Sequence, residues 1–170
     1  MPLVIWLTLA GCLIASYCDV RTRRIPNLLT GPMVLVALAV HALQGLGPLL
    51  TCVVVLAVMT VAGALVYSRG GIGAGDIKLA IAGSAMVSYP LCVPFLLYTA
   101  IAGGVLALVF LAVRANGRAV LSRAVYMTLA GAPGIATDKR EKLPYAVAFA
   151  IGAILIALSQ NVAPFLRINI

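Results

Sequence analysis

The chain has 170 residues, of which 64% are hydrophobic and only 9% are charged. A soluble domain of this length needs far more polar surface to cover its core, so the composition excludes an ordinary soluble protein. The formal net charge of +8 would suggest nucleic acid in a soluble protein, but Lys and Arg also gather in the cytoplasmic loops of membrane proteins. We therefore expect a membrane protein that contacts lipid and has no nucleic-acid partner.

Apolar stretches long enough to cross a bilayer recur along the sequence and predict an all-α, polytopic protein in a single domain over residues 1–170. About six transmembrane helices are expected, over residues 2–18, 28–43, 48–67, 76 to a break near 88–90, 91–113 and 143–159. The fourth is short for a hydrocarbon core of about 30 Å, so we expect it to tilt, to continue past Pro90 or to be partly buried in protein. Between the last two, residues 120–129 are expected to form an interfacial helix, followed by a turn at residues 131–134.

The basic residues fix the expected orientation of these helices. Of the 12 Lys and Arg residues, all except Arg167 fall in or beside the connections that follow the first, third and fifth helices. Positive charge gathers on the cytoplasmic side of membrane proteins. We therefore expect both termini to be extracytoplasmic.

Candidate chemical groups are few, because the chain has four acidic residues and one His. The four cysteines form no C-x-x-C pair, and metal catalysis requires several ligands gathered together, so neither a metal nor another cofactor is expected. His41 is expected at the membrane interface, without an acidic neighbour that would support a Ser-His site. Asp138 and Glu141 lie among basic residues and are expected in a solvated loop.

Asp19 and Asp76 differ from the other acids, because the helix assignment places both at the cytoplasmic boundary of apolar helices, where a carboxylate is costly without a partner or a function. Each has a simpler explanation on its own. Asp19 could pair with Arg21 or Arg23, and Asp76 could be favoured by a helix N-terminus. Two carboxylates at the same depth in the membrane are, however, a stronger indication, because two facing carboxylates are the catalytic groups of an aspartic protease.

Two neighbouring carboxylates suit peptide hydrolysis because like charges a few Å apart cannot both ionise easily. The ionised partner takes a proton from a water molecule, while the protonated partner donates to the scissile carbonyl oxygen. Such a pair titrates as a unit, so acid and base are not assigned individually. We expect Asp19 and Asp76 to form this pair.

The residues around the two acids are small. The segment before Asp76 is rich in glycine, which permits unusual backbone shapes and close approach of a substrate chain, and it lacks the Gly-Lys-Ser/Thr ending of a phosphate-binding loop. Small residues also follow the helix faces that carry Asp19 and Asp76. Such faces either pack directly on each other or form a groove for a substrate helix, and we favour direct packing.

Two motifs resemble those of bacterial prepilin peptidases. Residues 19–27 (DVRTRRIPN) resemble the first aspartate motif of this family, and residues 73–78 (GAGDIK) resemble the second, G-x-G-D-x-K. The start of the last helix at residues 143–146 (LPYA) is also similar, so that the resemblance spans nearly the whole chain. Members of the family cleave the short basic leader of type IV prepilins and pseudopilins on the cytoplasmic side of the membrane, before the hydrophobic pilin helix.

The resemblance implies that Asp19 and Asp76 are the catalytic pair of an aspartic endopeptidase in the bacterial inner membrane. It implies supporting or substrate-binding roles for the other matched positions, which are Gly73, Gly75, Lys78, Pro26, Asn27 and Pro144. Lys78 should point away from Asp76, since it lies two residues further along a helix. Pro26 and Asn27 are expected to end the loop and cap the second helix.

The sequence departs from the larger prepilin peptidases, which carry a cysteine-paired cytoplasmic domain in the first loop and also methylate the new N-terminus. No such domain is present between the first two helices, so methyltransferase activity is doubtful. The compact form is similar to the dedicated peptidases of Flp (Tad) pilus systems. The alternatives are a general intramembrane aspartic protease, and a small transporter or a pilus or secretion assembly subunit without protease activity.

Overall fold

The computed structural model describes residues 2–22, 25–69, 73–113 and 145–166, and within these ranges the chain is helical and contains no strand, which confirms the all-α prediction. The described helices are α1 (Pro2–Thr22), α2 (Asn27–Gln44), α3 (Leu46–Ser68), α4 (Ala74–Val87), α5 (Cys92–Val113) and α7 (Ala146–Leu166). The expected helix at residues 120–129, the turn at residues 131–134, the acids Asp138 and Glu141, and Pro144 lie outside the described residues.

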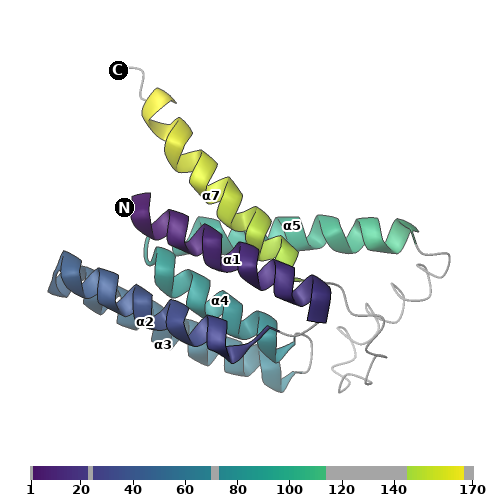
Figure 1. Cartoon of the computed structure of the whole chain (residues 1–170), viewed down its shortest axis with the longest axis horizontal. Coiled ribbons are helices and arrows are strands. Elements are labelled where there is room, and N and C mark those ends of the chain that lie inside the picture. Colours follow the sequence, from purple (N-terminus) through teal and green to yellow (C-terminus); the bar gives the residue numbers. More distant parts are fainter. Residues whose placement is uncertain (1, 23–24, 70–72, 114–144, 167–170) are drawn as a thin grey trace.

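Successive helices alternate in direction, so that one end of the bundle collects the ends of α1, α3 and α5 and the beginnings of α2, α4 and α7 (right-hand side of Figure 1). Asp19 lies in the last turn of α1 and Asp76 in the first turn of α4. We call this end of the bundle the aspartate end. The alternation explains why two acids far apart in the sequence share one end of the fold.

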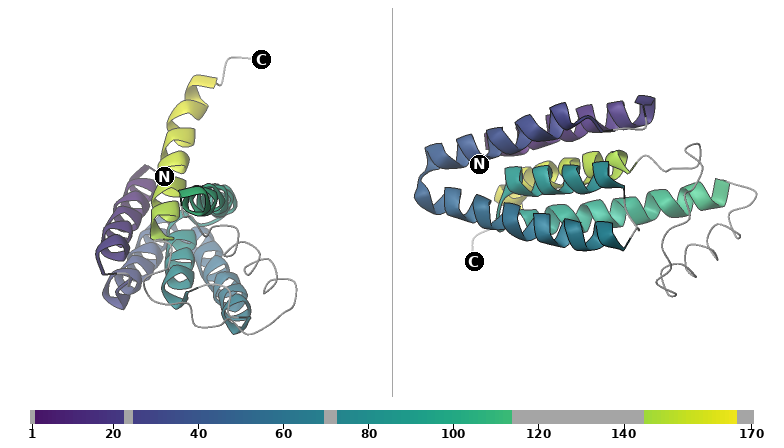
Figure 2. Two further views of the ribbon diagram at one scale, coloured as in Figure 1. Left: turned by 90° about the vertical axis from the view of Figure 1, so that its right-hand side faces the viewer. Right: turned by 90° about the horizontal axis from the view of Figure 1, so that it is seen from below.

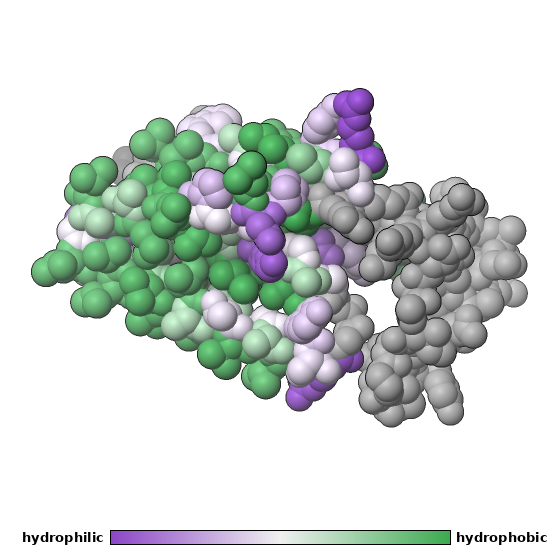
Figure 3. All heavy atoms as spheres, turned by 60° about the horizontal axis from the view of Figure 1, so that its bottom comes forward, coloured by the Kyte–Doolittle hydropathy of each residue, from purple (hydrophilic) through white to green (hydrophobic). Residues whose placement is uncertain are grey.

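Four of the described helices, α1, α2, α3 and α5, are long and apolar enough to cross a membrane, and α7 contains a shorter apolar segment, Ala146–Gln160. Much of their surface is apolar and exposed. In α3 only 17% of the most apolar stretch of the helix is buried inside the protein. Apolar side chains also cover most of the face shown in Figure 3. Apolar surface exposed on this scale is stable against lipid rather than water. The prediction of a multi-pass membrane protein is confirmed.

α4 is the central helix and contacts all the other described helices; in the view from below it lies between α2 and α3 (Figure 2). Its 14 residues span about 21 Å, less than a hydrocarbon core. Residues 82–88 are all buried, and several of them are Ala, Gly or Ser, which lets neighbouring helices approach closely. Of the three expectations for this short helix, burial within the protein is the one observed.

Among the described helices, the contact between α5 and α7 is the most extensive. The Phe95 and Phe149 rings lie 6.2 Å apart between their centroids. Next to them, Gly152 of α7 lies directly on α5, where an added Cβ would be 3.1 Å from the backbone nitrogen of Thr99 and 3.2 Å from its Cα. The backbones of the two helices therefore touch at this glycine.

Candidate active site

Asp19 is held by the beginning of the last helix. Its side chain is half-buried, and Oδ2 accepts the backbone N–H of Ala146 at 3.3 Å. The first N–H groups of a helix have no partner within the helix, and the helix dipole favours negative charge there. Arg21, one of the simple partners considered for Asp19, donates instead to the Tyr17 hydroxyl at 2.7 Å. The carboxylate of Asp19 is thus placed by tertiary structure.

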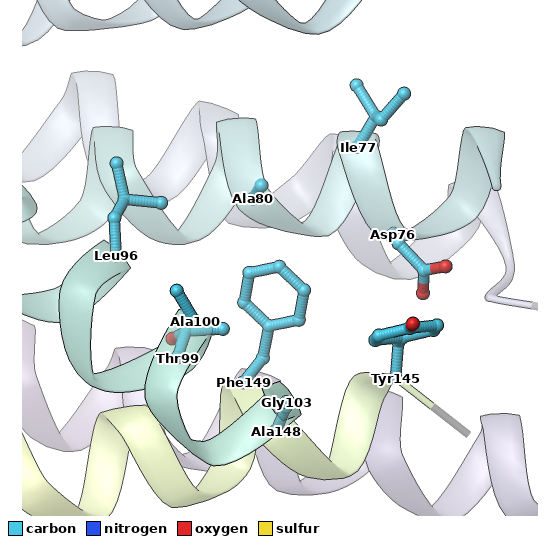
Figure 4. Close-up of a pocket in the computed structure, with 10 residues that line it drawn as sticks. All are labelled: Asp76, Ile77, Ala80, Leu96, Thr99, Ala100, Gly103, Tyr145, Ala148 and Phe149. Carbon is cyan, nitrogen blue, oxygen red and sulfur yellow. The ribbon is translucent and has the colours of Figure 1, made fainter. Parts of the chain in front are cut away.

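Asp76 points toward the same segment from α4. It is half-buried in the first turn of α4, and in Figure 4 its carboxylate is directed toward the ring of Tyr145. Tyr145 is adjacent in sequence to Ala146, whose N–H holds Asp19. Both acids therefore converge on two successive residues at the start of α7.

A cavity of about 280 Å³ adjoins Asp76 between α4, α5 and α7. Its size is close to the lower limit of ordinary ligand pockets, which begin at about 300 Å³. Asp76 alone among its lining residues is charged, and the rest of the lining is almost entirely apolar. The cavity is lined by Asp76, Ile77, Ala80, Leu96, Thr99, Ala100, Gly103, Tyr145, Ala148 and Phe149 (Figure 4). One carboxylate thus lies at the edge of an otherwise apolar space.

This cavity bears on the two expectations for the small-residue face of α4. Asp76 and Ala80 line the cavity together with residues of α5 and α7, and Gly83 lies against the Phe95 ring of α5. The preferred expectation was direct packing of this face on the face of α1 that carries Asp19. α1 and α4 do contact each other, and packing through these two faces stays a prediction. Beside Asp76 the same face of α4 borders the cavity, which is the feature that comes nearest to the groove of the second expectation.

The glycines before Asp76 have separate roles. Gly73 adopts φ −67° and ψ 143°, an extended shape open to most residues, but a Cβ on it would lie 3.1 Å from Asp76 Oδ2. Gly75 faces Ile25, with 3.4 Å between an added Cβ and the Cβ of Ile25. At both positions glycine provides space for a neighbouring group, whereas the sequence suggested unusual backbone shapes.

Lys78 and Asn27 contact each other, although 51 residues separate them: Lys78 Nζ donates to Asn27 Oδ1 at 2.9 Å. Lys78 thus turns away from Asp76, as helical geometry predicted. α2 does begin at Asn27, directly after Pro26, but no side-chain hydrogen bond caps it. The expectation that Asn27 caps α2 is therefore wrong, because the N-cap position is Pro26, whose side chain has no hydrogen-bonding group, and Asn27 is the first residue of the helix itself.

Sequence reasoning did not assign Tyr145 or the Ala146 N–H to the site. The residues belong to a segment that resembled the family, but only Pro144 was singled out from it. A usable indication was present, since a helix that begins at the same membrane boundary as two carboxylates offers unpaired N–H groups to an anion. His41, in the last turn of α2, is buried, and its Nδ1 contacts the carbonyl oxygen of Ala37 at 2.8 Å.

The comparisons with known proteins agree with the two motifs. No curated protein and no solved structure matches the chain. The model of the type IV leader peptidase family matches residues 6–108, a range that covers more than half of the chain and includes both aspartates and the cavity-lining part of α5. The start of α7 lies beyond the matched range. The chain belongs to the type IV leader peptidase family.

Proposed function

We propose that this protein is a membrane aspartic endopeptidase that uses Asp19 and Asp76 to remove the short basic leader of Flp-like type IV prepilins at the cytoplasmic face of the bacterial inner membrane. Membership of the type IV leader peptidase family supports a leader peptidase in general. The catalytic pair, the Flp-like substrate and the cytoplasmic location are our inference.

The observation that carries the proposal is the convergence of the two acids on α7. Asp19 accepts the N–H of Ala146, while Asp76 borders the cavity that Tyr145 lines. The two carboxylates thus approach adjacent residues, one from α1 and the other from α4. Such an arrangement suits a pair that acts on one peptide bond and one water molecule.

The chemistry requires one ionised and one protonated carboxyl group. The ionised group removes a proton from water, whose oxygen then attacks the scissile carbonyl carbon, while the protonated group donates its proton to the carbonyl oxygen. Breakdown of the tetrahedral intermediate returns a proton to the departing amine and releases the leader with a new carboxyl end. Neither carboxyl group is assigned as acid or base, because the pair shares one proton.

The cavity fits the expected substrate. A prepilin presents a basic leader and then a hydrophobic helix, so that the apolar part of the chain begins near the bond that is cut. The cavity beside Asp76 is almost entirely apolar, and apolar side chains transfer favourably from water into such a space. The leader would remain on the cytoplasmic side, where we expect the aspartate end to lie because of its basic residues.

Isosteric substitution tests the proposal. Asp19→Asn and Asp76→Asn, each co-expressed in membranes with a tagged Flp-like prepilin, should both lower cleavage by roughly 1,000-fold or more, because each removes one of two proton-transfer groups. Cleavage is followed by the gel shift that accompanies loss of the leader. Asp138→Asn, the matched control, should cleave at the normal rate.

Membrane abundance and thermal stability of each variant separate a chemical effect from misfolding. Normal processing by folded Asp19→Asn protein would refute the assignment of the pair. A transporter or assembly subunit without protease activity would instead leave the prepilin uncut by the wild-type protein.

A further inference from the structure

Two contacts join the beginning of α2 and the residues just before it to the first two turns of α4. Lys78 Nζ donates a hydrogen bond to Asn27 Oδ1 at 2.9 Å. Ile25 lies against Gly75 so closely that a Cβ on the glycine would be 3.4 Å from the Ile25 Cβ and 3.6 Å from its Cγ1 and Cδ1. We call these four residues, Ile25, Asn27, Gly75 and Lys78, the clasp.

The clasp holds α4 on a different side from the cavity. Gly75 and Lys78 are three residues apart and so share one helix face, whereas Asp76 is turned by about 100° from Gly75. The first face meets Ile25 and Asn27, and the second meets the cavity and Tyr145. Contacts on one side of this turn therefore determine where the carboxylate on the other side is directed.

The clasp also links the segments that carry the two acids. Ile25 and Asn27 follow Asp19 by six and eight residues, and Gly75 and Lys78 flank Asp76. Movement of α4 along or about its axis would shift Asp76 relative to the end of α1, and would require both clasp contacts to break. The contacts thus constrain the relative position of Asp19 and Asp76 without touching either carboxylate.

We propose that the clasp sets the relative position of the two aspartates for leader cleavage, with Lys78 and Asn27 as positioning residues. The proposal rests on the proposed function. The role of Lys78 is then intramolecular, because its ammonium group donates a hydrogen bond to Asn27. The positive charge of Lys78 would also repel a basic leader. If Lys78 and Asn27 instead bound the substrate, their replacement would change KM.

Kinetics of the purified enzyme with a tagged Flp-like prepilin provide the first test. Asn27→Ala and Lys78→Met should each lower kcat by about 10-fold with little change in KM, since small misplacement of reacting groups slows the chemical step itself. The double variant should be no slower than the slower single variant, because both changes break the same bond. Asn27→Asp keeps an acceptor oxygen for Lys78 and should stay within about 3-fold of the wild-type rate.

Arg69→Met is the matched control for Lys78→Met. Arg69 is an exposed basic residue at the end of α3, at the same end of the bundle, so its replacement removes the same charge without touching the clasp. It should leave kcat unchanged.

A second measurement needs no substrate. With the four native cysteines replaced by Ala, the pair Ile25→Cys and Gly75→Cys places two Cβ atoms at a separation near the range of about 3.5–4.5 Å found in disulfides. Oxidative cross-linking in membranes should be rapid. Adding Asn27→Ala should slow it by about 3-fold or more, because loss of one clasp contact loosens the other, whereas adding Arg69→Met should not.

The outcomes separate the two proposals. Three results, each with an active wild-type enzyme, would overturn the role of the clasp alone. The losses of kcat in Asn27→Ala and Lys78→Met could multiply in the double variant, or the effects could be found in KM. The third result is a rate of cross-linking that Asn27→Ala leaves unchanged. If the Ile25→Cys, Gly75→Cys protein cross-links as expected but the wild-type protein cuts no prepilin, the proposed function is overturned, and the positioning role with it.

Discussion

Gly73 provides room for the Asp76 carboxylate. It precedes α4 with φ −67° and ψ 143°, values that alanine also adopts without strain. The space beside it is restricted, since a Cβ would be 3.1 Å from Asp76 Oδ2. Glycine is therefore required here because of the space that the Asp76 carboxylate needs. A larger residue should reduce the rate of cleavage more than it reduces the stability of the fold.

Gly73→Ala tests this requirement. We expect normal membrane abundance but about 10-fold slower prepilin cleavage, because the added methyl group displaces the Asp76 carboxylate from its position. Gly31→Ala on α2, where an added Cβ meets nothing within 4 Å, is the control and should be fully active. Loss of folded Gly73→Ala protein would show that the backbone, not the carboxylate, needs the glycine.

Single residues also show how far the sequence could lead. Charge distribution and hydrophobicity were enough to place Asp19 and Asp76 at one end of the helices, and helical geometry was enough to turn Lys78 away from Asp76. The start of a helix at the same boundary indicated that unpaired N–H groups were near, but the individual partners could not be predicted. Ala146 is 127 residues from Asp19 and Asn27 is 51 residues from Lys78, and contacts at such separations depend on how the helices pack rather than on local pattern.

Among the helices, hydropathy predicted number and order well but described the ends less well. The apolar stretch of the first helix ends near Cys18, yet α1 continues to Thr22. Its last turn is held by polar contacts: Thr22 Oγ1 donates to the Cys18 carbonyl oxygen at 2.8 Å, and Arg21 donates to the Tyr17 hydroxyl. Hydropathy marks where a helix leaves the lipid, whereas side-chain hydrogen bonds extend it beyond that boundary.

The close contact between α5 and α7 leads to a prediction at this scale. Gly152→Ala should lower stability by about 1–3 kcal/mol, because the added methyl group meets the Thr99 backbone and forces the two helices apart. Thermal unfolding in detergent would show this as a lower melting temperature. Gly104→Ala on α5, where an added Cβ meets nothing within 4 Å, should unfold at the wild-type temperature; equal losses for both variants would contradict the explanation.

Over the whole molecule, the alternating helices give each end of the bundle its own composition. The described basic residues Arg21, Arg69 and Lys78 lie at the aspartate end, whereas the connection of α2 to α3 at the opposite end carries none. Since basic ends of membrane proteins face the cytoplasm, the distribution that predicted the topology also predicts the side on which the cleavage chemistry occurs.

Labelling of single cysteines tests this orientation. The native cysteines are first replaced by Ala. In spheroplasts whose inner membrane is intact, a cysteine introduced by Gly47→Cys at the exposed start of α3 should react with a membrane-impermeant maleimide. Ser68→Cys, at the exposed end of the same helix, should react only after the membrane is permeabilised. The reverse pattern would place the aspartate end outside the cell and refute cytoplasmic cleavage.

The dependence of both acids on the first residues of α7 has a consequence for biosynthesis. The ribosome delivers the chain from its N-terminus, so Asp19 and Asp76 enter the bilayer well before Tyr145 and Ala146 are made. A nascent chain that has inserted only α1 to α5 already contains both carboxyl groups but lacks the amide on which Asp19 rests. Under the proposed function, proteolytic competence would therefore arise only when translation is nearly complete.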